Sequence, residues 1–150
     1  LGSLALIARA AWANSRMHLL RQAASASRDV LDVASVSISQ LEPDARQIRT
    51  LINFGVLGLR EIAEPSDETY SVDEFASLRS VIDQVKGWGT SVDGGDPDDA
   101  DVQLLTRLGK HCSIAVPIPM DGPVGAMLDA TGRPKLEFPE PAPVDVVEES

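Results

Sequence analysis

Residues 112–128 read CSIAVPIPMDGPVGAML and carry the clearest structural signal in the chain. Two apolar segments flank a central Asp-Gly pair, which is a turn signal that joins antiparallel strands. We therefore expect strands over 112–120 and 123–131, paired as a hairpin. Pro117 and Pro119 have no amide hydrogen to donate, so the first of these strands is expected to be an edge strand or to be bulged at the prolines.

A second hairpin is predicted nearer the N-terminus. Over residues 34–41, β-branched residues alternate with serines, and this period of two is typical of a strand. A Glu-Pro-Asp turn at 42–44 follows, and residues 46–55 form the partner strand. The same alternation places Ser37 on the face of its strand that carries the other serines.

Helices are expected before and between the two hairpins. Apolar residues recur at helical spacing over 3–13 and 16–32, and whether these two helices fuse is left open by the sequence. Ser71 and Glu74 match a capping box, which predicts a helix that runs from there to Gly87.

The rest of the segment between the hairpins completes the order of elements. Residues 56–70 show no period and are expected to be a loop, and residues 88–92 form a short strand. A further helix begins with Asp96 as N-cap and ends at Gly109. Two hairpins that flank a helical insert predict an α+β domain with three layers.

These elements resemble a GAF domain, a sensory fold similar in architecture to PAS domains. The likeness covers about residues 16–135 and rests on loose patterns rather than on a chemical signature. Its strongest part is the final hairpin. The other matching parts are a helix that ends in Gly before this hairpin and an opening helix that leads into a strand. The matching segments are Val116-Pro117-Ile118, Asp121-Gly122, Val124–Leu128, Leu104–Gly109 and Leu31–Ile38.

The resemblance implies a central antiparallel sheet with the terminal helices on one face. The insert, residues 56–111, covers the other face and can enclose a pocket. We accordingly divide the chain into a leading helix (1–15) for dimerisation or signalling, a GAF-like domain (16–135) and a Pro/Glu-rich tail (136–150) in which a further helix starts.

A ligand pocket between the sheet and the insert is the first candidate site. A pocket needs apolar walls and a few placed polar groups. The polar candidates are Ser37 and Asn53, the latter on a strand face shared with Arg49 and Leu51. The wall candidates are Phe75, Leu78, Ile82 and Trp88. The alternative is that the apolar residues fill the core and the serines face water.

Catalytic and metal sites find little support in the sequence. No Ser-His-Asp, His-Glu-x-x-His, P-loop or Gly-x-Gly-x-x-Gly pattern is present, so we expect no enzyme, and no cofactor is identified. Bilin-binding relatives of the fold carry Cys before His, whereas here the order is His111-Cys112. The acidic run over 93–101 lacks the spacing of a calcium loop and suits the first turn of a helix, so no metal is expected.

The leading helix is more apolar than an exposed helix should be. Leu4, Ile7 and Trp12 need a partner surface, either this domain or a second copy, and a homodimer through this helix is expected. The composition also limits the other classes of partner that we expect. With 13 basic and 23 acidic residues, the chain has a net charge of −10, which argues against nucleic acid and anionic membranes as partners.

We therefore expect a non-catalytic sensory or regulatory module of a larger signalling or transcription-control protein. It would bind a small molecule, dimerise, or do both, and carry a covalently attached output domain. No signal peptide or membrane span is visible, so the cytoplasm is the expected compartment. The alternative is a structural module for dimerisation or protein docking without a ligand.

Overall fold

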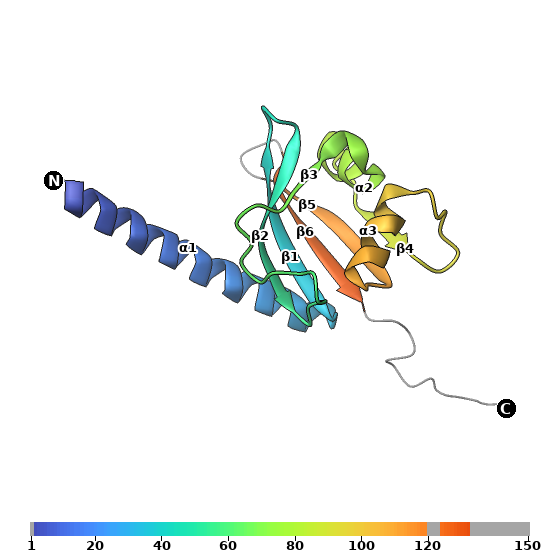
Figure 1. Cartoon of the computed structure of the whole chain (residues 1–150), viewed down its shortest axis with the longest axis horizontal. Helices are drawn as coiled ribbons and strands as arrows, with labels where there is room; N and C mark the ends of the chain where they lie inside the picture. Colours follow the sequence, from blue (N-terminus) through green and yellow to red (C-terminus); the bar gives the residue numbers. More distant parts are fainter. Residues whose placement is uncertain (1, 120–123, 133–150) are drawn as a thin grey trace.

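A curled, six-stranded antiparallel sheet with the strand order β3-β2-β1-β6-β5-β4 forms the centre of the molecule (Figure 1). The structure, a computed structural model, describes residues 2–119 and 124–132. The elements are α1 (Gly2–Leu31), β1 (Ser35–Glu42), β2 (Gln47–Gly55), β3 (Thr69–Ser71), η1 (Val72–Glu74), α2 (Ala76–Leu78), η2 (Arg79–Asp83), β4 (Trp88–Ser91), α3 (Ala100–Leu108), β5 (Cys112–Pro119) and β6 (Val124–Gly132).

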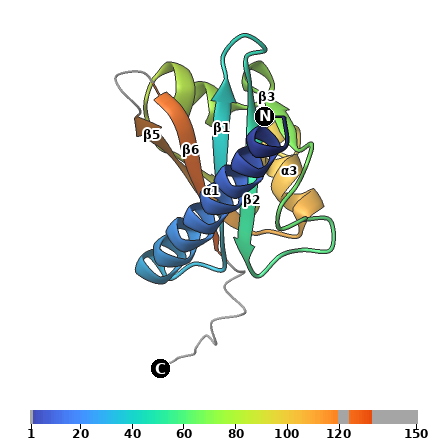
Figure 2. The same cartoon turned by 90° about the vertical axis from the view of Figure 1, so that its left-hand side faces the viewer.

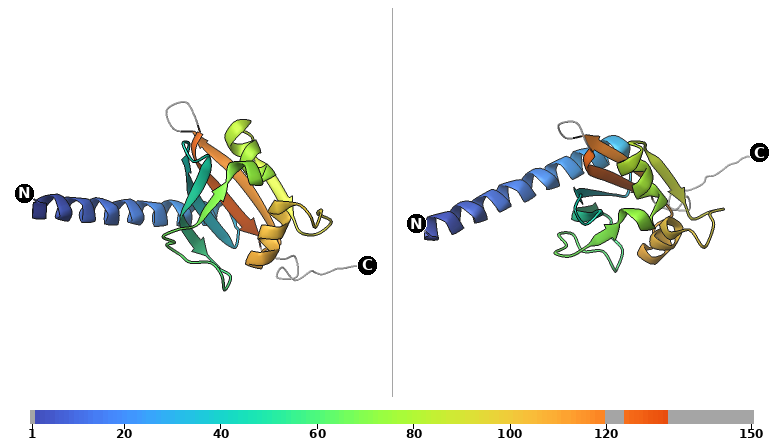
Figure 3. Two further views of the ribbon diagram at one scale, coloured as in Figure 1. Left: turned by 45° about the horizontal axis from the view of Figure 1, so that its top comes forward. Right: turned by 90° about the horizontal axis from the view of Figure 1, so that it is seen from above.

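Helix α1 is unbroken, so the two helices expected at the N-terminus are fused into one of 30 residues. Its second half crosses one face of the sheet (Figure 2). Ala24, in this half, is fully buried. Its first half projects beyond the sheet into solvent (Figure 3). At 1.5 Å per residue the whole helix is about 45 Å long.

Both predicted hairpins are present, β1 with β2 and β5 with β6. Strand β4 pairs only with the first half of β5, from Cys112 to Ala115. Along Pro117 and Pro119, β5 therefore pairs with β6 on one side and has no partner strand among the described residues on the other. The register between β5 and β6 shifts next to Pro119. The sheet edge itself is β4, so β5 is open on one side only along its second half, and the predicted irregularity occurs at Pro119 but not at Pro117. The turn at 121–122 lies outside the described residues.

The insert between the hairpins is less regular than the sequence predicts. The segment expected to be a loop contains the short strand β3, which pairs with β2. The prediction of one continuous helix after Ser71 is wrong. The 3-10 turn η1 ends at Phe75, which is extended, and α2 and the π-helical turn η2 follow. Ser71 makes no capping hydrogen bond, because the chain leaves the helical conformation directly after Glu74.

Helix α3 starts three residues later than predicted. Its N-cap is Asp99, whose side chain accepts a hydrogen bond from the amide of Asp101. Asp96 instead accepts a hydrogen bond from the amide of Asp98 in the loop that leads to the helix. The predicted end is confirmed, since Gly109 adopts the left-handed conformation that terminates a helix.

Two apolar clusters hold the layers together. On one face, Ala24 of α1 packs against Val36, Ile38, Ile52 and Ala130 of the sheet. On the other face, the sheet packs against η1, α2 and η2, with the core residues Ile48, Val72, Phe75, Leu78, Val81, Ala115 and Met127. The predicted α+β fold is confirmed, with the second half of α1 on one face of the sheet and the insert on the other. The tail, residues 136–150, lies outside the described residues.

Candidate functional site

A cavity of about 70 Å³ lies between the sheet and the insert. Its floor consists of small side chains on neighbouring strands, among them Ser37 of β1 and Ser113 and Ala115 of β5. The roof is apolar and comes from α2, α3 and the residues next to them, namely Phe75, Leu78, Leu104, Leu105 and Leu108.

Four of the six predicted pocket residues line this cavity: Ser37, Asn53, Phe75 and Leu78. The other two do not. Ile82 packs against the apolar cluster on the insert side of the sheet. Trp88 begins the edge strand β4 and is 38% exposed.

The face of β2 that borders the cavity differs from the prediction. Ile38 of β1 pairs with Ile52, but the next residue of β1, Ser39, pairs with Thr50. Leu51 has no opposite partner and forms a bulge, so the alternation of faces shifts at this point. As a result Asn53 shares the cavity side with Thr50 and Ile48, and the predicted companions Arg49 and Leu51 are not among the lining residues.

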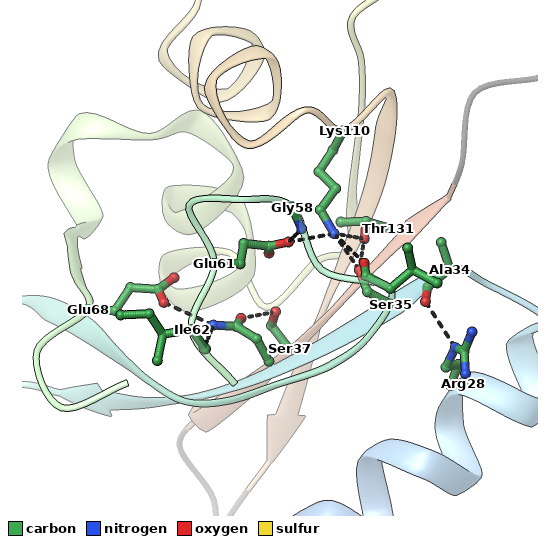
Figure 4. Close-up of polar contacts among 12 residues, drawn as sticks. Arg28, Ala34, Ser35, Ser37, Gly58, Glu61, Ile62, Glu68, Lys110 and Thr131 are labelled. Atoms are coloured by element: carbon green, nitrogen blue, oxygen red, sulfur yellow. Dashed lines mark hydrogen bonds and ion pairs between the residues drawn. The ribbon is translucent and has the colours of Figure 1, made fainter. Parts of the chain in front are cut away.

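The predicted polar pair, Ser37 and Asn53, forms part of a hydrogen-bond network that holds the insert on the sheet (Figure 4). The Ser37 hydroxyl donates to Asn53 Oδ1 at 2.6 Å. Asn53 Nδ2 donates to the carbonyl of Ile62 at 2.8 Å and to Glu68 Oε1 at 3.0 Å. Because both amide hydrogens are engaged within the protein, Asn53 clamps the loop after β2 rather than offering free donors to the cavity.

A buried ion pair closes one end of the cavity. Lys110 Nζ lies 2.9 Å from Glu61 Oε1, and the two side chains are each only 7% exposed. Lys110 also donates to the Ser35 hydroxyl at 2.7 Å and to the carbonyl of Val56 at 3.3 Å. Figure 4 shows Lys110 reaching from the end of α3 toward Glu61 and the first residue of β1. Sequence reasoning missed this pair, because nothing in the local pattern marks either residue as buried.

Asp129 on β6 is the most unusual group in the cavity wall. Its carboxyl is enclosed by protein, and its Oδ1 has no hydrogen-bond partner among the described residues. Burial, with a further contribution from Asp101, raises the pKa of Asp129 to about 7, while Lys110 lowers it. The sequence contained a signal for this residue: an aspartate within an apolar strand, two positions from the buried residues Met127 and Thr131.

A surface hollow adjoins the cavity. It is lined by the loop after β2 and by the end of α3, and it shares Glu61, Glu68, Tyr70, Leu104 and Leu108 with the cavity wall. A larger, apolar hollow of about 530 Å³ lies on the opposite face, beside the end of α1 and over β5 and β6. We assign the candidate site to the smaller cavity, because it combines apolar walls with placed polar groups.

The other sequence candidates show ordinary structural contacts. His111 Nε2 lies 3.1 Å from the exposed carboxylate of Asp93, and Cys112 is a free, half-buried thiol. In residues 2–119 and 124–132, no three His, Cys, Asp or Glu side chains are grouped so that they could hold a metal ion.

No family model and no curated protein matches the sequence. Solved structures do match in fold. The phycocyanobilin-bound GAF domain of a cyanobacterial phytochrome has a TM-score of 0.59 at 17% identity, with 83% of this chain and 76% of that chain covered. The GAF domain/HD domain protein from Geobacter sulfurreducens has a TM-score of 0.59 at 12% identity, with coverages of 77% and 73%.

The GAF domain of an Acinetobacter phosphoenolpyruvate-protein phosphotransferase has a TM-score of 0.56 at 12% identity. The match covers 76% of this chain but only 63% of that domain. The sheet order, the helical insert and these neighbours agree, so the protein has a GAF-like α+β fold, as the sequence resemblance implied. None of the helices that the structure describes is long and apolar enough to cross a membrane.

Proposed function

We propose that this domain is a sensory or regulatory module that binds a small molecule in the cavity between the sheet and α3. The observation that carries the proposal is the cavity itself, with small residues on its floor, leucines above and a buried carboxylate in its wall. The proposal assigns no catalytic step to the domain. It places the domain in the cytoplasm, linked to an output domain in the same protein.

A connected set of contacts supports a route from the cavity to α1. Glu61 and Thr131 line the cavity, and both lie within hydrogen-bonding distance of Lys110. Lys110 bonds Ser35, and the carbonyl of the preceding residue accepts a hydrogen bond from Arg28 Nε of α1 at 2.9 Å (Figure 4). A ligand that displaced Glu61 would therefore act on residues held directly against α1.

Filling the cavity is expected to abolish ligand binding. In Ala115→Leu, the added carbon atoms would occupy the cavity floor, so a metabolite that stabilises the wild type should no longer do so. For the wild type, a ligand at a hundredfold excess over its Kd should raise Tm by roughly 5–10 °C. Thermal-shift screening and native mass spectrometry of both proteins would measure this.

Val116→Leu is the matched control, because it alters the neighbouring residue of β5, which lines the apolar hollow on the other face. This variant should respond to ligands as the wild type does. If no ligand class shifts the wild type, or if Ala115→Leu and the wild type respond alike, the proposed sensing function is wrong.

A homodimer through α1 is a second candidate function, favoured by the exposure of its apolar residues. Leu4, Ile7 and Trp12 are 67%, 64% and 72% exposed. With 3.6 residues per turn, they lie on a different side of α1 from Ala24, which faces the sheet. A second copy could cover this side without disturbing the contact between α1 and the sheet.

The double variant Leu4→Glu/Ile7→Glu is expected to weaken such a dimer by at least about a hundredfold, because two apolar side chains leave the interface. Sedimentation equilibrium over a range of concentrations would measure the dissociation constant. Leu6→Glu is the control, since Leu6 is 65% exposed but lies on the side of the helix that Ala24 occupies. A wild type that stays monomeric at high concentration would exclude this candidate.

A further inference from the structure

Asp129 lies in the floor of the cavity, among the small side chains that form it. Its cross-strand neighbours are Ser37 of β1 and Ala115 of β5, both of which also line the cavity. Small residues on both sides leave the space above the carboxyl unfilled. Asp129 retains some accessible surface even though its carboxyl is enclosed by protein, because the side chain borders the cavity.

The other carboxylates of the cavity wall already have partners. Asp101 accepts hydrogen bonds from the amide and hydroxyl of Ser77. Glu61 accepts from the amide of Gly58 as well as from Lys110. Glu68 accepts from the hydroxyls of Tyr70 and Thr50 and from Asn53.

Asp129 Oδ1 is the one buried side-chain oxygen or nitrogen without a hydrogen-bond partner in the part of the chain that the structure describes. A buried acceptor in this state costs free energy until a donor reaches it. This unpaired oxygen belongs to the carboxyl group of a residue that lines the cavity.

The charge around the cavity favours a cationic donor. Four carboxylates line it, Asp101, Asp129, Glu61 and Glu68, and no basic side chain of the described residues does. Lys110 balances one of these negative charges by pairing with Glu61. A cation in the cavity would offset the remaining excess and donate to Asp129, whereas an anion would meet several carboxylates at once.

We propose that the cavity binds a small aliphatic ammonium ion, whose N–H donates to the carboxylate of Asp129 while its alkyl part lies against the leucines of α3. The size of the ligand follows from the cavity. The cavity admits only a small ligand of a few non-hydrogen atoms, because its volume is about 70 Å³. This inference rests on the proposed function and names its ligand class.

Ammonium binding at this position depends on pH. The ligand pairs with the ionised form of Asp129, whose pKa burial raises to about 7. Asp101 and Glu61 also raise that pKa, Lys110 lowers it, and Glu68 lies in the same cavity wall. An alkylammonium keeps its proton at pH 8, so binding is expected to be about tenfold tighter at pH 8 than at pH 6.

Isothermal titration calorimetry of the 150-residue chain with n-butylammonium tests the inference, with 1-butanol and butyrate as neutral and anionic probes of similar size. So small a ligand is expected to bind with a Kd of about millimolar. Asp129→Asn should weaken butylammonium binding about 10- to 100-fold, because it removes a charged acceptor. Asp98→Asn, at an exposed aspartate, should leave it unchanged.

The outcomes separate this inference from the proposed function. The expected result is a preference for butylammonium that is stronger at pH 8 and lost in Asp129→Asn. Binding of 1-butanol or butyrate with equal affinity, or binding without dependence on pH in the wild type, would overturn the ammonium inference and leave a ligand cavity in place. An equal response to Mg²⁺ would overturn it too. If no probe or metabolite binds and Ala115→Leu changes nothing, the proposed function itself fails.

Discussion

Replacing Asp129 by Asn is expected to stabilise the protein at neutral and alkaline pH. Relative to the wild type, the free energy of unfolding of the variant should rise by about 4 kcal/mol between pH 4 and pH 8. The reason is that the ordinary pKa of the carboxyl is 3.8, whereas burial raises it to about 7 in the folded protein.

The direction of this change in the free energy of unfolding follows from proton binding. Between pH 3.8 and 7 the folded protein holds a proton on Asp129 that the unfolded chain has released. The wild type therefore loses stability as the pH rises through this window, and above pH 7 it carries the full cost of an ionised, enclosed carboxylate. Asparagine has nearly the same shape and no such titration.

Urea denaturation of both proteins at several pH values between 4 and 8 would measure this difference. Asp98→Asn is the control for an exposed aspartate of the same chain, and its difference from the wild type should change little across the range. A difference between Asp129→Asn and the wild type that stays constant from pH 4 to 8 would show that the carboxyl is not enclosed in solution.

A residue that lowers stability at neutral pH calls for another reason to be present. Buried carboxylates with raised pKa values gather at binding and catalytic sites, where a charged group must be held ready for a ligand. Asp129 lies in the wall of the cavity. Its carboxyl group both lowers the stability of the fold and contains the oxygen without a hydrogen-bond partner. The expected gain in stability of Asp129→Asn and its expected loss of ammonium binding are thus two consequences of one arrangement.

The strands and their pairing could be predicted from the sequence because local patterns specify them. Alternating residues and short turns define both hairpins, and the two prolines of β5 marked the part without a second partner strand. The broken helix after Ser71 could not be predicted. There the capping pattern favours a helix, but Phe75 is only 6% exposed in an extended conformation, so tertiary packing overrides the local signal.

The site could be predicted only in part, for a similar reason. Ser37, Asn53, Phe75 and Leu78 were predicted as pocket residues and line the cavity, whereas the leucines of α3 in its wall were not predicted. The bulge at Leu51 shifts the faces of β2, and no residue type in that stretch announces it. Glu61 is brought to Lys110 by the path of an irregular loop, so the pair is a long-range contact that spacing along the chain does not encode.

Replacing Lys110 by Met is expected to destabilise the protein by about 3–5 kcal/mol. The ammonium group lies within 3.4 Å of oxygens from four residues, Glu61, Ser35, Val56 and Thr131. Methionine preserves most of the side-chain volume but leaves a buried charge on Glu61, whose side chain is 7% exposed. Among the described residues, only the amide of Gly58 would still donate to it. The free energy of unfolding from urea titrations at pH 8 would measure the loss.

A double-mutant cycle separates the buried charge from the packing. In Lys110→Met/Glu61→Gln no unpaired charge remains, so the double variant should be more stable than Lys110→Met alone.

Arg46→Met is the matched control, because Arg46 pairs with Asp83 at 2.6 Å but on the surface, with 44% of its side chain exposed. Solvent and salt screen such a pair, so Arg46→Met should lower the free energy of unfolding much less than Lys110→Met does. Equal losses for the two single variants would mean that the Lys110–Glu61 pair is open to water and does not close the end of the cavity.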